Sequence, residues 1–369
     1  MDRFNELNLG RAIFVLLATI TVIIVGAVLK ITSSIMLLFT ISLLLALVIS
    51  PLVNFLQKFH IPKIASILLV VIFLIGGLYA MGMILYSSGR TLATLYPRYE
   101  ARITEIYVWV ANFFELPYDE HLSIFENIWG QAGIRNLVRD MTLDFSSTFL
   151  GFVTNAVMMV IIMIFILIEA VFFKEKLNRA FEGTRAGQII KIGSDIMTQV
   201  TRYLSIKFII SLVTGLLVGI GLRIVGVEFA AVWGLIQFVL NFIPNIGSIV
   251  VGVSATLFAL VQFWPDPVPI VAAGLVMLFF NMVIGVIIDP KIMGDNLGIS
   301  PLMVLVSLMI WGWLWGFAGL ILAVPMISII KIFCENIPVL EPISILLGSH
   351  KAVLAVKSAE EKKGKAGEE

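Results

Sequence analysis

The feature that most limits the fold is a run of 35 residues, 229–263, without a charged side chain. As one straight helix this run would be about 50 Å long, whereas the hydrocarbon core of a bilayer is about 30 Å thick. Its centre reads NFIPNIGS, from Asn241 to Ser248, and proline and glycine permit a reversal there. We therefore predict two arms of about 15 residues joined by a turn inside the membrane. The alternative is one helix kinked at Pro244.

A second uncharged run covers residues 302–330 and would be about 44 Å long as a single helix. Ser300 and Pro301 are typical of a helix start, with serine as the N-cap and proline at the first position. The middle of the run reads WGWLWGFAG, from Trp311 to Gly319. We predict a second hairpin here, with one long tilted helix as the alternative.

Composition assigns the chain to the membrane proteins. Sixty per cent of the 369 residues are hydrophobic and 13% are charged, whereas a soluble domain carries about a quarter charged residues. We predict an all-α polytopic membrane protein with about six full transmembrane helices, two re-entrant hairpins and a small external helical domain, or else eight plain spans. The six spans are predicted at 12–29, 35–55, 64–86, 149–173, 208–225 and 269–288.

Basic residues in the loops predict the orientation. Residues 174–207 carry seven basic and three acidic side chains and should be cytoplasmic, whereas residues 87–147 carry five basic and eight acidic ones and should lie outside. Both termini are then cytoplasmic. The expected divisions are N-terminal transmembrane helices (1–86), an external helical segment (87–147), a transmembrane helix (148–173), a cytoplasmic amphipathic helix (174–207), a transport core (208–333) and a cytoplasmic tail with a disordered end (334–369).

The order of spans and hairpins suggests an inverted repeat. The span 208–225 runs outward and precedes a hairpin that enters from outside, while the span 269–288 runs inward and precedes one that enters from inside. Secondary transporters often have this plan, with a midplane site at the repeat interface.

Several functional classes find no support in the sequence. There is no HExxH, P-loop or nucleophile elbow, so we predict that the protein is not an enzyme. The single Cys334 and the three histidines have no metal-ligand spacing, and we expect no metal and no cofactor. The net charge of +1 and the lack of a basic stretch argue against nucleic acid as a partner.

Three stretches of the chain resemble the autoinducer-2 exporter family of bacterial membrane proteins. They are VWGLIQFVLNFIPNIGSIV from Val232, IIDPKIMGDNLGISPLMVLVSLMIWGWLWGFAGLILAVPMISIIKI from Ile287, and ALVISPLVNFLQKFHIPKIASILL from Ala46. The resemblance implies export of autoinducer-2, a small polar quorum-sensing molecule, across the bacterial inner membrane. It also implies a homo-oligomer, described as a pentamer, and some relatives are assigned as sodium/proton antiporters.

A neutral polyhydroxy ligand requires amide and hydroxyl partners and an aromatic face. Gln237 and Asn241 are four residues apart and share a helix face. The alternatives to solute contact are hydrogen bonds between helices for the amides and a membrane-interface position for the tryptophans. The candidate substrate-binding residues are Gln237, Asn241, Pro244, Asn245, Gly247, Asn281, Trp311 and Trp313.

Two carboxylates near the membrane are candidates for ion coupling, first Asp289 and then Glu169, the alternative for each being an ion pair at a helix end. Gly316 and Gly319 are predicted hinge positions. The sequence therefore favours an exporter that works by alternating access. The rivals are a sodium/proton antiporter and a non-transporting scaffold or channel-like oligomer.

Overall fold

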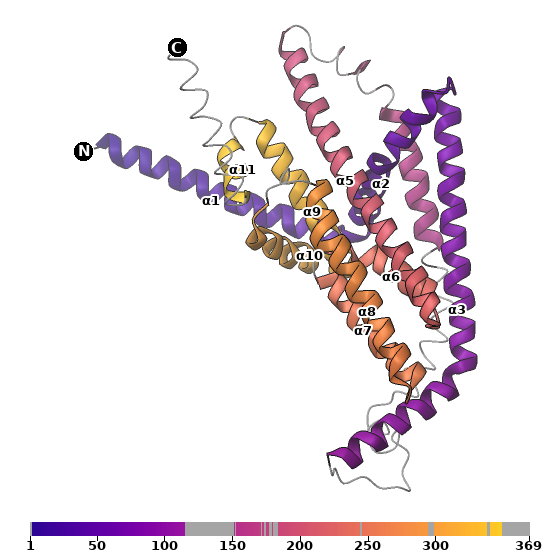
Figure 1. Ribbon diagram of the computed structural model, residues 1–369. Coiled ribbons are helices and arrows are strands. Elements are labelled where there is room, and N and C mark those ends of the chain that lie inside the picture. The colour runs from indigo at the N-terminus through magenta and orange to yellow at the C-terminus, as the bar shows by residue number, and fades with distance from the viewer. Residues whose placement is uncertain are drawn as a thin grey trace, which may run out of the picture.

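The computed structural model describes residues 2–114, 151–179 with gaps at 152, 171, 173–174 and 177–178, and residues 184–243, 246–293, 299–337 and 340–348. Every regular element in these ranges is a helix (Figure 1). Seven of the described helices are long and apolar enough to cross a membrane: Ser33–Gln57, Lys63–Phe113, Val153–Ala170, Ile190–Val225, Ile246–Phe263, Pro267–Ile288 and Pro301–Asn336. The prediction of an all-α polytopic membrane protein is confirmed.

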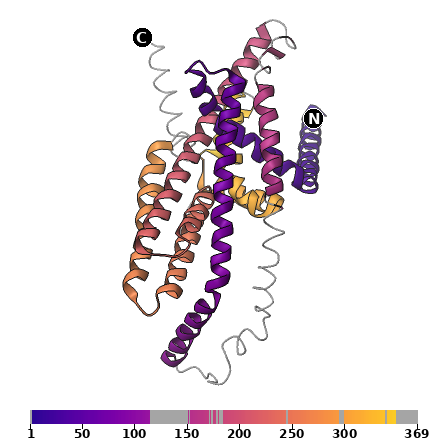
Figure 2. The ribbon, with the colours of Figure 1, turned by 90° about the vertical axis from the view of Figure 1, so that its right-hand side faces the viewer.

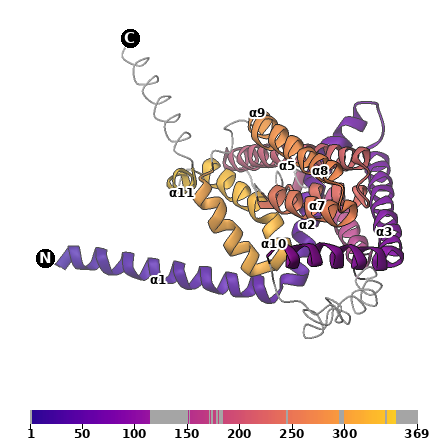
Figure 3. The ribbon, with the colours of Figure 1, turned by 60° about the horizontal axis from the view of Figure 1, so that its bottom comes forward.

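The first helix, α1 (Asp2–Ile31), meets α2 (Ser33–Gln57) at a corner formed by Thr32. From this corner α1 extends away from the other helices (Figure 3). Those of its apolar side chains that the structure describes are mostly exposed, including Leu16 and Ile23. In a bilayer, lipid or another protein surface would cover them.

The scaffold bundle consists of α2, α3 (Lys63–Phe113) and the helix Val153–Ala170. These three helices share one apolar cluster, in which Met163 is fully buried against α2 and α3. We use the name scaffold bundle for these three helices throughout.

Two helices continue past predicted segment ends, at residues 86 and 207. The helix α3 continues as far as Phe113, and α5 (Thr184–Val225) joins the predicted amphipathic segment to the following span. The apolar stripe of Ile192, Ile196, Val200 and Tyr203 packs against α2 and the last long helix. The stripe thus packs on neighbouring helices, one of the two arrangements open to an amphipathic segment of this kind.

The first hairpin consists of α6 (Ala230–Leu240) and α7 (Ile246–Phe263). Its turn lies within NFIPNIGS as predicted, but the arms are unequal, with 11 and 18 residues. A helix α8 (Pro267–Met282) then runs beside α7 (Figure 2). It continues through a π-helical turn, η2 (Val283–Ile288), into α9 (Asp289–Met293). The core bundle, as we call α5 to α8, is built around buried residues such as Val218, Ala255 and Met277.

The second uncharged run forms α10 (Pro301–Asn336), which reverses at Gly316. Gly316 has φ 62° and ψ −139°, angles that side chains with a Cβ rarely adopt. The Ser307 hydroxyl donates to the Ala323 carbonyl at 2.7 Å, which shows that the two arms lie antiparallel. The hairpin prediction is therefore confirmed, and the single tilted helix is wrong. A short helix, α11 (Glu341–Leu347), follows.

We call the end of the molecule that holds the α7–α8 turn and the last part of α3 the outer end, following the predicted orientation. It is the lower end in Figure 1. The first hairpin begins and ends there. The second arm of α10 rises toward the opposite, inner end, so the two hairpins approach from different directions, as an inverted arrangement requires.

Candidate functional site

A cluster of uncharged polar side chains surrounds the tip of the first hairpin. The Gln237 side chain of α6 is fully buried, and its Nε2 donates to Asn281 Oδ1 of α8 at 2.9 Å. Asn281 Nδ2 in turn donates to the backbone carbonyl of Ser248 on α7 at 3.4 Å. Gln237 Nε2 also lies 3.5 Å from the Ser248 hydroxyl. Three helices thus contribute to one amide-rich cluster.

A second branch of the cluster reaches α5. Asn241 Nδ2, at the end of α6, donates to the hydroxyl of Ser211 at 3.0 Å, and both residues are buried. Gln237 Oε1 is buried and has no hydrogen-bond partner among the residues that the structure describes. We call Gln237, Asn241, Ser211, Ser248 and Asn281 the tip cluster.

The hairpin turn itself is tightly packed. A Cβ at Gly247 would lie less than 3.0 Å from the carbonyl group of Leu240, so only glycine fits there. Gly247 therefore allows the start of α7 to approach the end of α6. Pro244 and Asn245, two of the predicted substrate-binding residues, lie outside the described residues.

The tip of the first hairpin packs against the arms of the second in a small apolar cluster. Ile243 of the first tip packs with Leu308 and Ala323 of α10, and the half-buried Trp311 packs against this cluster. Trp311 thus lies beside the first hairpin tip. Trp313 does not: it is 64% exposed, and Lys30 of α1 lies over its ring at 3.6 Å from the centroid.

The two predicted hinge residues occupy different positions in the second hairpin. Gly316 forms the reversal and is exposed. A Cβ at Gly319 would overlap the carbonyl group of Trp311, so this glycine permits close contact between the arms. Trp315 is buried beside Trp311, and its Nε1 donates to the Leu29 carbonyl of α1 at 3.2 Å.

One of the two carboxylates is in a buried ion pair. Asp289 Oδ2, just after the π-helical turn, lies 2.9 Å from Nζ of Lys207 on α5, and the two side chains are 20% and 7% exposed. The other oxygen, Oδ1, is buried, and no described residue forms a hydrogen bond with it. Glu169 instead pairs with Lys176 on the surface, where both side chains are more than half exposed. Of the two, only Asp289 is close to the core bundle.

Lys207 and Ser211 were not among the residues proposed from the sequence. They are one turn apart on α5, and Thr214 and Tyr203 continue the same buried stripe. The sequence pattern that could have indicated them is a series of polar residues at spacings of three and four within an apolar helix. Their partners are 82 and 30 positions away in the chain, so only the fold connects them.

Comparison with known proteins identifies the family. A family model described as AI-2E family transporter matches residues 13–338, which is most of the chain. The chain belongs to the AI-2E transporter family. It is therefore a multi-pass membrane transport protein, and the resemblance noted from NFIPNIGS and the two other stretches is confirmed.

Relatives of this AI-2E transporter come from several bacteria. A putative transport protein of Haemophilus influenzae is 33% identical over 351 residues, which is 93% of this chain and 98% of the relative. A putative transport protein of Borreliella burgdorferi is 29% identical over 329 residues, 89% and 88% of the two chains. The AI-2 transport protein TqsA of Escherichia coli K12 is 28% identical over 347 residues, 92% and 96% of the two chains.

Proposed function

We propose that this AI-2E transporter exports a small, neutral, hydroxyl-rich molecule of the autoinducer-2 type across the bacterial inner membrane, with both termini in the cytoplasm. The observation that carries the proposal is the tip cluster: buried amides and hydroxyls, without a charged member, at a break between two membrane helices. Non-helical backbone at membrane depth is stable only within protein or beside a watery cavity. The name of the Escherichia coli relative supports the substrate class.

The chemistry of the tip cluster suits such a ligand. Amide groups both donate and accept, so they can satisfy several hydroxyl groups of a sugar-like solute. Leaving the buried Gln237 Oε1 unpaired costs about 1–3 kcal/mol. A hydroxyl group of the solute would remove this cost by donating to that oxygen. Trp311 supplies an aromatic ring next to the first hairpin tip.

Alternating access would arise at the contact between the first hairpin tip and the arms of the second hairpin. Gln237 is fully covered in this conformation, so a solute reaches it only after surrounding groups move. The cluster of Ile243, Leu308 and Ala323 is small, so the two hairpins can separate without opening the larger bundle cores. We propose that such separation exposes the tip cluster to one side at a time.

Apolar replacements of similar size test the tip cluster. We expect Gln237→Met and Asn281→Leu each to lower autoinducer-2 flux into proteoliposomes at least about fivefold, because a lost hydrogen bond to a buried group is worth about 1–3 kcal/mol. Thr214→Val is the matched control: among the described residues, this buried hydroxyl bonds only to the Ile210 carbonyl of its own helix, at 2.7 Å. Normal flux in both amide variants would show that these residues only join helices.

A sodium/proton antiporter is the second candidate, and the Asp289–Lys207 pair favours it. An incoming cation at the unpaired Oδ1 would compete with Lys207 for the carboxylate. This function predicts sodium-dependent proton movement in everted vesicles that is lost in Asp289→Asn. Absence of any saturable flux, of solute or of ions, would instead favour a scaffold or a channel-like oligomer.

We also propose a homo-oligomer, which by resemblance would be a pentamer. The extended position of α1 and its exposed apolar side chains support this proposal, because a neighbouring copy would cover part of that surface. The mass of the purified particle in detergent tests it.

A further inference from the structure

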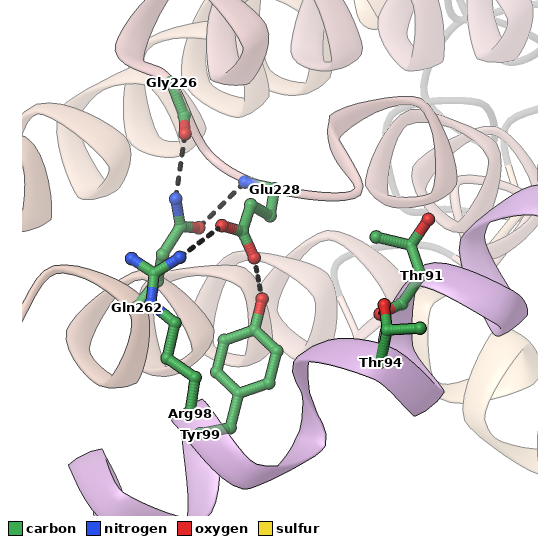
Figure 4. Close-up of polar contacts among 7 residues, drawn as sticks. All are labelled: Thr91, Thr94, Arg98, Tyr99, Gly226, Glu228 and Gln262. Atoms are coloured by element: carbon green, nitrogen blue, oxygen red, sulfur yellow. Dashed lines mark hydrogen bonds and ion pairs between the residues drawn. The ribbon is translucent and has the colours of Figure 1, made fainter.

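Three side chains join α3 to the connection between α5 and α6 at the outer end (Figure 4). Glu228, in that connection, accepts a hydrogen bond from the Tyr99 hydroxyl through Oε2. Its Oε1 lies 3.2 Å from Nη1 of Arg98. We call Arg98, Tyr99 and Glu228 the outer latch.

The Glu228 side of the outer latch is itself held in place by α7. Gln262 Oε1 accepts from the backbone N–H of Glu228 at 2.8 Å, and Gln262 Nε2 donates to the Gly226 carbonyl at 2.9 Å. Both bonds are drawn in Figure 4. The α5–α6 connection is thereby tied to the core bundle, so it does not move independently of α7.

The outer latch connects two bodies that have separate apolar cores. Arg98 and Tyr99 belong to α3, whose buried residues pack with α2 and Val153–Ala170. Glu228 belongs to the core bundle, whose buried residues come from α5 to α8. Near the outer latch the two bodies also meet through rings: Tyr99 lies 5.4 Å from Phe258, and Trp109 lies 5.4 Å from Trp264, centroid to centroid.

The inner contact between the same two bodies is different in kind. There Leu44 of α2 packs with Ile196, Val200 and Leu204 of α5 in a buried apolar cluster. Separating that cluster would expose apolar surface to water or leave a void. Opening the outer contact exchanges protein hydrogen bonds for water hydrogen bonds and separates two ring contacts, which changes the free energy less than separating the larger inner cluster. The outer contact is therefore the one that can open repeatedly.

We propose that the outer latch is the outer gate of the transporter. It holds α3 against α6 and α7 in the described conformation, and it opens when the core bundle tilts away from the scaffold bundle, with the α2–α5 contact as the pivot. This proposal rests on alternating access as proposed above. Its test measures exposure of a side chain and needs no transported solute, so failure of autoinducer-2 export would leave it standing.

The experiment uses a reporter cysteine at Ile103. This half-buried residue of α3 lies one turn after Tyr99 on the same helix face, and Tyr99 contacts Phe258 of α7. The full-length protein would carry Ile103→Cys and Cys334→Ala, since Cys334 is the natural cysteine. A membrane-impermeant maleimide is added from outside to spheroplasts, and the labelling rate is measured with the latch intact and with Tyr99→Phe or Glu228→Gln.

We expect slow labelling with the latch intact and a rate at least about tenfold higher in both latch variants, the factor for losing one hydrogen bond to a charged group. Tyr99→Phe keeps the ring against Phe258, so packing is preserved. Thr94→Val is the matched control, because Thr94 is exposed on the same helix and its hydroxyl donates to the Thr91 carbonyl, its one partner in the described part of the chain. Unchanged labelling in both latch variants, or an equal increase in Thr94→Val, would overturn the proposal.

Discussion

Gly247→Ala is expected to destabilise the first hairpin by about 3 kcal/mol, at the upper end of the usual range for overpacking. The added Cβ would overlap the Leu240 carbonyl group, which is backbone and cannot turn away as a flexible side chain can. Relief would require α6 and α7 to separate, and this would displace Asn241 and Ser248 from the tip cluster. Thermal unfolding in detergent should show a midpoint lowered by roughly 4 °C, with solute flux lost.

Gly76→Ala is the control for this substitution. Gly76 lies within α3, and a Cβ there would meet nothing within 4 Å. Alanine in a helix interior is favoured over glycine by about 0.5–1 kcal/mol, so this variant should be as stable as the unmodified protein or slightly more stable. Equal midpoints for the two variants would contradict the described turn.

The second large effect is expected at the buried ion pair. Lys207→Met removes the partner of Asp289 and leaves a carboxylate that is only 20% exposed. Breaking a buried pair from one side typically costs about 3–5 kcal/mol, whereas replacing both partners is often nearly neutral. We expect the double variant Lys207→Met with Asp289→Asn to recover most of the stability lost in the single variant.

Lys331→Met is the matched control. Lys331 is also buried, but its partner Glu335 is 38% exposed and can be hydrated when it is left alone. Its loss should cost about 1 kcal/mol or less beyond packing. Vesicle assays on the stable double variant then separate two roles for Asp289. Retained ion-dependent flux would mean that the pair is structural, and its loss would mean that Asp289 takes part in coupling.

Much of the fold could be predicted because bilayer thickness limits the length of a helix. The two uncharged runs were too long for one span and carried proline or glycine near their centres, so both reversals were predictable. The unequal lengths of the two arms of the first hairpin could not be predicted in this way. The short arm α6 is set by contact with α5, where Gly215 and Gly234 bring the two backbones together, and this contact depends on tertiary packing.

The candidate site was predictable only in part. Gln237 and Asn241 share a helix face by spacing alone, and the structure places Asn281 beside Gln237. Ser211 and Lys207 required knowledge of which helix packs against the hairpin. Trp313 and Glu169 have suitable chemistry, but both face the surface. Hydropathy alone does not show which side of an apolar helix faces outward.

The length of α5 has a mechanical consequence. From Tyr203, in the inner apolar cluster, to Gly226 beside the latch is a lever of about 35 Å. A rigid-body tilt of about 10° about the inner cluster would move the far end by roughly 6 Å, comparable to the width of a sugar ring, and the middle by only half as much. Displacement is therefore greatest at Glu228 and smallest near Lys207, so a single rotation could release the outer contacts while keeping the ion pair together.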